Sequence, residues 1–212
     1  MKDRLTVFFY MDKLQQYKYF KYTPLKRSNL RGIPQFNQDY IQPTTVKSYK
    51  VAIRNKIKYI VELYYYESIV FLKFHPKVFE NHPNKYQLIG MNLRISEKRG
   101  LLNTCCKIIL DEIDKSNDEK AVYCFFGQWY EKDNRLNRMH TKRFELYEKQ
   151  ATTFFSNQNF FHFKQSLINF YAISPIQNNK VSQQINQLFD EMTKKDEIIG
   201  QFMTERAKNE FL

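Results

Sequence analysis

Cysteine is scarce in this sequence, with three residues among 212. Cys105 and Cys106 are adjacent in a predicted helix, and Cys124 lies in a predicted strand, so their spacing fits neither a disulfide framework nor a zinc site. We expect three buried thiols in a reducing compartment. His75 and His82 have no acidic or cysteine partner at ligand spacing, and we therefore expect no metal site.

Apolar runs of bilayer length are also absent. Glu62 and Glu67 interrupt the most apolar segment, residues 59–74. The first twelve residues carry charge followed by a short apolar run, but they lack a small-residue cleavage site. The sequence thus predicts a soluble, cytoplasmic protein with neither a secretory signal nor a membrane partner.

Acidic residues are almost missing from the first 60 positions, where thirteen lysines and arginines face three aspartates. This segment carries a charge of +10 out of +12 for the whole chain. Between residues 13 and 31 the cations alternate with aromatic residues, a pattern that suits phosphate contacts and base stacking. The alternative is a solvated edge whose aromatic rings pack on the sheet. The candidate anion-binding residues here are Lys18, Lys21, Lys26, Arg27 and Arg31.

What is present is a pattern of short apolar strands and two amphipathic helices. We expect strands at 49–53, 58–66, 68–74 and 86–95, a helix at 98–115, a central strand at 121–126, a helix ending near 155, strands at 159–164 and 167–173, and a C-terminal helix within 181–211. This order predicts an α/β (α+β) domain with a twisted, mostly antiparallel mixed sheet. The acidic residues late in the first helix, Asp111, Glu112 and Asp114, are expected on its solvated face.

The chain divides into three parts on this interpretation. A basic, aromatic N-terminal arm occupies 1–46, the α/β core 47–175, and an amphipathic C-terminal helix 176–212. Docking of that helix on the core and binding to a partner protein both remain open.

A second candidate anion site follows the central strand. Trp129, the only tryptophan, could offer a flat wall to a base, and a group of cations follows it. If the next helix begins by Asn134, three of these cations share one face near its positive end. The alternative is that Trp129 covers the sheet edge while the cations pair with nearby carboxylates. The cations are Arg135, Arg138, Lys142 and Arg143.

The order of elements from 48 to 173, together with the segment 144–149 (FELYEK), resembles the GCN5-related N-acetyltransferase (GNAT) superfamily. The resemblance implies a GNAT-like sheet flanked by two main helices, acetyl-coenzyme A as cofactor, and Tyr147 as the acid that protonates the departing thiolate. At the family's pyrophosphate loop, residues 97–102 keep only Gly100 of the pattern, so the implied loop is degenerate. The chain is also similar to uncharacterised Bacteroidota proteins containing a domain of unknown function.

Three functions follow from these patterns. The first is non-catalytic binding of nucleic acid or another polyanion without a cofactor, as would suit an accessory protein of a mobile element or a defence system. The second is acyl transfer from coenzyme A, as the resemblance implies. The third is a protein-interaction module that uses the C-terminal helix.

Overall fold

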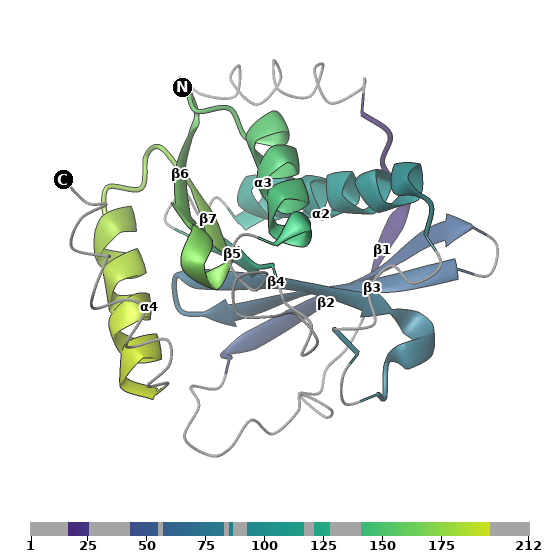
Figure 1. Ribbon diagram of the computed structural model, residues 1–212, viewed down its shortest axis with the longest axis horizontal. Helices are drawn as coiled ribbons and strands as arrows, with labels where there is room; N and C mark the ends of the chain where they lie inside the picture. Colours follow the sequence, from purple (N-terminus) through teal and green to yellow (C-terminus); the bar gives the residue numbers. More distant parts are fainter. Residues whose placement is uncertain are drawn as a thin grey trace.

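The computed structural model describes residues 17–25, 43–54, 57–82, 85–86, 93–116, 121–127 and 141–195 (Figure 1). Within these residues the protein is a mixed α/β fold in which a seven-stranded, mostly antiparallel sheet is accompanied by three α-helices. The strands are β1 (Tyr22–Leu25), β2 (Thr45–Arg54), β3 (Ile57–Tyr66), β4 (Ile69–Pro76), β5 (Val122–Phe126), β6 (Phe160–Gln165) and β7 (Phe170–Pro175). The helices are α2 (Ile95–Ser116), α3 (Lys142–Phe154) and α4 (Val181–Lys195), with single 3-10 turns at η1 (Lys77–Phe79) and η2 (Ser166–Ile168).

The strands lie in the order β1-β2-β3-β4-β5-β7-β6. All neighbours are antiparallel except β4 and β5, which run parallel and share three residue pairs, from Ile69 with Val122 to Phe71 with Cys124. A parallel pair needs a crossover, and α2 lies between the two strands along the chain. The parallel pair therefore joins an antiparallel meander, β1–β4, to a second antiparallel group, β5-β7-β6.

The hairpin between β3 and β4 fixes the side-chain pattern of the meander. Its two-residue turn includes Glu67, which has a φ of 52°, and it places Tyr66 opposite Ile69. Side chains alternate between the two faces of a strand, so this register determines which residues meet on each side of the sheet.

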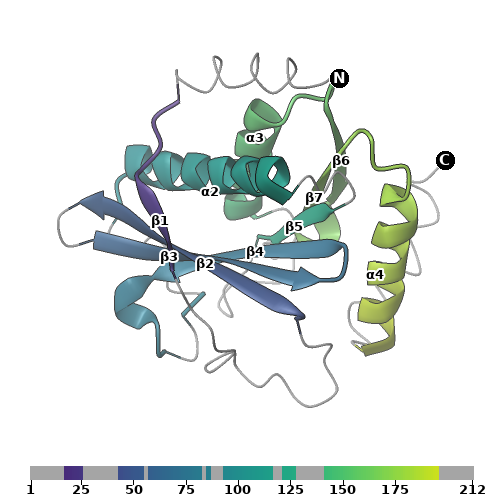
Figure 2. The same ribbon diagram turned by 180° about the vertical axis from the view of Figure 1, so that it is seen from behind.

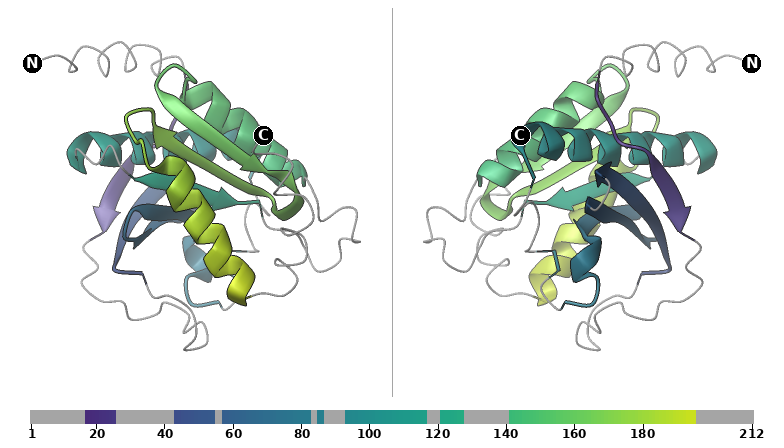
Figure 3. Two further views of the ribbon diagram at one scale, coloured as in Figure 1. Left: turned by 90° about the vertical axis from the view of Figure 1, so that its left-hand side faces the viewer. Right: turned by 90° about the vertical axis from the view of Figure 1, so that its right-hand side faces the viewer.

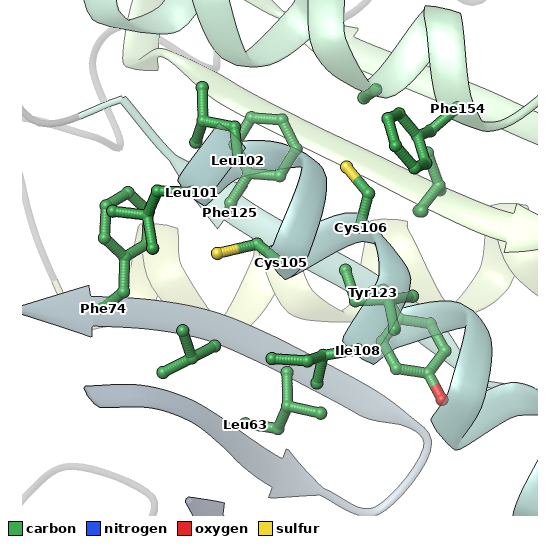
Figure 4. Packing of buried hydrophobic residues seen from close by; sticks show 14 of the residues in the cluster. Leu63, Phe74, Leu101, Leu102, Cys105, Cys106, Ile108, Tyr123, Phe125 and Phe154 are labelled. Carbon is green, nitrogen blue, oxygen red and sulfur yellow. The ribbon is translucent and has the colours of Figure 1, made fainter. Parts of the chain in front are cut away.

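The main core lies between the sheet and the helices α2 and α3, which contact each other (Figures 1 and 2). Figure 4 shows Leu101, Cys105 and Ile108 of α2 pointing toward Phe74 and Leu63 of the strands. All three cysteines are buried and form no disulfide. Burial raises the pKa of each thiol, that of Cys106 to about 12, so the thiols are poor nucleophiles near neutral pH.

The helix α4 packs on the opposite face of the sheet, over β5-β7-β6 (Figure 3). Its residues Ile185, Leu188 and Phe189 join the apolar side chains that these strands turn away from α3. Docking on the core thus accounts for the apolar stripe of this helix as far as Phe189. No described helix is long and apolar enough to span a bilayer.

Three details differ from the sequence predictions. The strand β1 was not expected, yet Tyr22–Leu25 pairs with β2 at the sheet edge. The strand predicted at 86–95 is wrong at its ends, because Tyr86 lies in a turn and Ile95 begins α2, while 87–92 fall outside the described residues. The helix α3 begins at Lys142 rather than by Asn134, since Thr141 has an extended backbone and its hydroxyl caps the amide of Phe144.

Candidate functional site

The face of β1–β4 turned away from α2 and α3, called the outer face below, carries most of the described polar side chains of these strands. Residues paired across neighbouring strands lie on the same face, so the register defines rows. One row contains Thr23, Lys50, Ile60 and His75, and the next contains Leu25, Ser48, Glu62 and Lys73. Beyond them, the backbone bond from Ala52 to Lys21 and the pairing of Ala52 with Lys58 define a third row.

These rows make the outer face basic. Lys21 and Lys58 are exposed, and Lys50 and Lys73 are partly buried. Among the described residues of β1–β4, Glu62 is the one carboxylate whose position lies on this face. The outer face is therefore cationic at one end and carries a single buried acid near its middle.

Glu62 is 4% exposed and lies at the centre of an ionic cluster. Its Oε2 atom accepts hydrogen bonds from the hydroxyl groups of Tyr86 at 2.6 Å and Tyr64 at 3.1 Å. The same oxygen lies 3.6 Å from Lys85 Nζ and 3.6 Å from His75 Nε2. The five residues Glu62, Tyr64, His75, Lys85 and Tyr86, together with Lys73, form what we call the Glu62 cluster.

Aromatic rings hold a second cation in the cluster. The ammonium of Lys73 lies 5.0 Å from the ring centroid of Tyr64 and 5.4 Å from that of Tyr86. Lys85 lies 4.9 Å from the same Tyr86 ring. Cation–π contacts of this kind stabilise ammonium groups that have lost part of their water shell. The cluster thus places two lysines beside one carboxylate.

His75 is completely buried within the cluster. Its Nδ1 lies 3.0 Å from the Pro76 carbonyl oxygen, which can only accept, so Nδ1 carries a proton. Among the described residues, His75 Nε2 and the buried Ser48 Oγ have no hydrogen-bond partner. Both atoms lie on the outer face, next to Glu62 in the register.

The cluster keeps fixed charges rather than exchanging protons. Burial alone would raise the pKa of Glu62, but the contacts with His75 and Tyr86 and the charge of Lys85 outweigh burial and lower the pKa to about 2. Burial and the Glu62 charge raise the pKa of Tyr64 and Tyr86. Because the carboxylate stays ionised and the phenols stay protonated around neutral pH, the Glu62–tyrosine contacts do not form an acid–base pair suited to catalysis there.

The predicted basic arm is partly described. Tyr17 packs on Phe154 with ring centroids 5.0 Å apart, Tyr22 packs edge-on against Tyr49, and Phe20 contacts the core. These three rings therefore pack on the core, whereas Tyr19 is 44% exposed. Lys18 and Lys21 are exposed, while Lys26, Arg27 and Arg31 lie outside the described residues.

The second predicted site is described only at its end. Trp129, Arg135 and Arg138 lie outside the described residues. Lys142 is exposed and Arg143 is half-buried, both in the first turn of α3 on the helix side of the sheet. The sheet therefore separates these two cations from the outer face.

The residues implied by the GNAT resemblance lie on the helix side. Tyr147 is half-buried between Phe74 of β4 and Phe125 of β5, at ring-centroid distances of 5.9 and 5.3 Å. Gly100 lies in the second turn of α2, where an added Cβ would come within 2.7 Å of the Phe20 ring. At the start of this helix, the Glu97 carboxylate accepts the Arg94 amide at 2.8 Å.

Sequence reasoning missed the Glu62 cluster and misplaced Glu112. Glu112 was expected on a solvated face, but it is 4% exposed and accepts hydrogen bonds from Lys47 at 2.5 Å and Tyr65 at 3.2 Å. The short turn at Glu67 was a sequence signal for one part of the cluster, because it pairs Glu62 with Lys73. Among the described residues, no three His, Cys, Asp or Glu side chains gather as a metal site would require.

Comparisons with protein-family models, with curated proteins and with solved structures found no match to this chain.

Proposed function

We propose that the outer face of β1–β4 binds a polyanion, with nucleic acid as the main candidate, and that it does so without catalysis. The observation that carries this proposal is the distribution of charge over the rows. Four lysines, Lys21, Lys50, Lys58 and Lys73, lie on the outer face, and its one described carboxylate is engaged by Lys85 and two tyrosines. Rows of cations neutralise phosphates and release their counterions, which favours binding at low salt.

The Glu62 cluster supports this role by keeping charge within the face. Lys73 and Lys85 are both strongly screened from water, and burial lowers the pKa of Lys73 while Glu62 opposes that shift. The carboxylate and the tyrosine rings thus hold two cations at fixed positions within the outer face.

Replacing Lys21, Lys50 and Lys58 together with glutamine tests the proposal. We expect the wild-type protein to bind single-stranded DNA, duplex DNA and transfer RNA with a log–log salt slope of about −3 to −5. The triple variant should flatten that slope by about 2 for single strands and about 3 for duplex, because three phosphate contacts are lost. Fluorescence anisotropy across a salt series measures both values.

A matched variant controls for total charge. Lys98, Arg99 and Lys149 are exposed on α2 and α3, so replacing them with glutamine removes the same charge from the helix side. This control should keep the wild-type slope. Equal flattening in both variants would show that overall charge, and not the outer face, drives binding. No wild-type binding at low salt would disprove the proposal.

A second candidate function is acyl transfer from coenzyme A. It is favoured by the strand order, in which β4 and β5 run parallel for three residue pairs, and by Tyr147, whose ring lies between Phe74 and Phe125. This arrangement supports a GNAT-like core. Acyl transfer stays the second candidate because of Glu97, which lies at the N-terminus of α2. In the GNAT family the pyrophosphate of coenzyme A approaches this end of the helix, and a carboxylate there would repel it.

Acetyl-coenzyme A separates the two candidates. An acyltransferase should show a melting temperature that rises with the ligand concentration, because the ligand binds the folded state alone. Tyr147→Phe should keep that rise and slow acetyl transfer to amine acceptors, since only the phenol hydroxyl, the implied proton donor, is lost. If millimolar acetyl-coenzyme A leaves the melting temperature unchanged, the acyltransferase candidate is rejected.

A further inference from the structure

The strand β6 ends the sheet on the side opposite β1 (Figure 1). Among the described strands it pairs with β7 alone, through its six residues Phe160–Gln165. The backbone groups along such an edge are a template to which another strand can add. An edge of this kind therefore needs either protection or a partner.

The backbone of β6 directs hydrogen-bonding groups to the open side. The Ile176 amide donates to the Asn159 carbonyl, just beyond the ends of β7 and β6. Bonded and non-bonded residue pairs alternate along an antiparallel ladder, so Phe161 bonds to β7 while the amide and carbonyl groups of His162 and Lys164 point outward. These four groups have no hydrogen-bond partner in the part of the chain that the structure describes.

The two edges of the sheet differ in their protection. The strand β1 contains Pro24 and directly follows the exposed Lys21. Proline and lysine are two common means of preventing strand addition at an edge. The strand β6 contains no proline, and the ammonium of its one lysine, Lys164, lies 2.7 Å from the Glu148 carboxylate of α3. The β6 edge thus lacks the protection that β1 has.

The surface around β6 is also poor in charge. Residues 151–187 contain two charged side chains, Lys164 and Lys180, although 26% of the whole chain is charged. Within this segment Phe161 is 43% exposed and Ile176 is 42% exposed, and the register places both positions on the α4 side of the sheet. Depletion of charge together with exposed aromatic area is typical of the centre of a protein–protein interface.

We infer that β6 pairs with β6 of a second copy of this chain, in an antiparallel, two-fold symmetric arrangement centred on His162. The outward backbone groups of His162 then bond to those of His162 in the second copy, and Lys164 lies opposite Phe160. On the α4 side, Phe161 lies opposite Phe163 of the second copy. Aromatic pairs facing each other across two strands stabilise a sheet, and this one covers the exposed Phe161 ring.

Charge and symmetry favour a second copy as the occupant of this edge. The net charge of +12 makes two copies repel each other over most of their surface, and this repulsion is weakest where charge is scarce. A two-fold interface uses the same patch on both chains, so the aromatic pair occurs twice. In the proposed register Lys164 faces an aromatic residue and not another cation. This association is independent of polyanion binding.

Sedimentation velocity of the full chain tests the inference at about 0.5 M salt, where contacts between exposed charges are screened. We expect a dimer with a dissociation constant in about the micromolar range. Phe161→Lys should raise that constant at least about tenfold, because it places a charge in the centre of the interface. Thr23→Lys is the matched control, since it adds the same charge at an exposed position on the opposite edge and should stay dimeric.

Single cysteines test the register. The three native cysteines are buried, so an accessible thiol at the edge is introduced by His162→Cys. Two copies of residue 162 would lie about 5.5 Å apart between their Cα atoms, within the range of a disulfide. Two copies of residue 164 would lie about 14 Å apart, so Lys164→Cys is the control that should not cross-link. Non-reducing gel electrophoresis after mild oxidation compares the two variants.

Each outcome decides the inference. A wild-type chain that stays monomeric at about 100 μM would overturn it. So would a dimer that Phe161→Lys leaves intact or that Thr23→Lys disrupts equally, and so would cross-linking through Lys164→Cys instead of His162→Cys. Circular dichroism checks that the variants fold, and Phe161→Ser replaces Phe161→Lys if the latter does not. Nucleic acid is absent from these measurements, so their failure would leave the polyanion proposal standing.

Discussion

Replacing Glu62 with glutamine is expected to lower the free energy of unfolding by about 3 kcal/mol at pH 7. The substitution keeps the shape of the side chain but leaves the ammonium of Lys85, whose side chain is 7% exposed, without its carboxylate partner. Buried ion pairs that lose one member typically cost this much, because the remaining charge has already given up its water. Urea unfolding monitored by circular dichroism measures the change.

The pH dependence of wild-type stability should show the same interaction. The folded-state pKa of Glu62 is about 2, below its ordinary value of 4.5. A lowered carboxyl pKa stabilises the folded state above the unfolded pKa, and that stabilisation is lost as the pH falls from about 4.5 to about 2. The shift corresponds to about 3 kcal/mol, in agreement with the expected cost of Glu62→Gln. In the variant this part of the acid transition should disappear.

Two further variants separate the buried pair from surface effects. Glu148 pairs with Lys164 at 2.7 Å on a partly exposed surface, so Glu148→Gln should cost less than about 1 kcal/mol. Adding Lys85→Met to Glu62→Gln should recover part of the lost stability, because it removes the unpaired cation. If Glu62→Gln costs no more than Glu148→Gln, the carboxylate does not hold the cluster together.

Gly127→Ala is expected to destabilise the protein by about 2–3 kcal/mol. An added Cβ would lie 2.7 Å from Phe144 Cβ, 2.9 Å from its Cα and 3.0 Å from its amide nitrogen. These atoms belong to Phe144, which is fully buried in the first turn of α3, and they cannot move without shifting the helix. Thermal unfolding should show a lower melting temperature.

Gly100→Ala is the comparison for this prediction. Its new Cβ also meets an atom at 2.7 Å, but that atom is at the far edge of the Phe20 ring, which can rotate. Alanine also favours a helix over glycine by about 1 kcal/mol, which offsets part of the clash inside α2. Gly100→Ala should therefore be the milder substitution. The reverse order would show that α3 can adjust more easily than Phe20.

Much of the strand and helix order could be predicted because it rests on local patterns. The alternating and apolar runs of β2, β3 and β4, the apolar stripe of α2 and the continuous run of β5 are encoded in adjacent residues. The strand β1 gave no such signal, since Pro24 and the surrounding lysines resemble an irregular segment. Proline is tolerated there because β1 is an edge strand, with one side that makes no ladder bonds.

The Glu62 cluster could not be predicted because its members meet only in three dimensions. Lys85 and Tyr86 come from the connection after β4, and nothing in their local sequence indicates that they return to β3. Glu62 was recognised only as an interruption of an apolar run. Its pairing with Lys73 was within reach of sequence reasoning through the hairpin, whereas the convergence of His75, Tyr86 and Lys85 on one oxygen required the tertiary structure.

The join between β4 and β5 has a consequence for how the chain folds. The hairpins β2–β3, β3–β4 and β6–β7 pair residues that are near in sequence, so each can form early with little loop-closure cost. Ile69 and Val122 are separated by the whole of α2, and their pairing must wait for a long loop to close. We therefore expect the two antiparallel groups to gain structure separately, and the parallel seam to form in the step that makes folding cooperative.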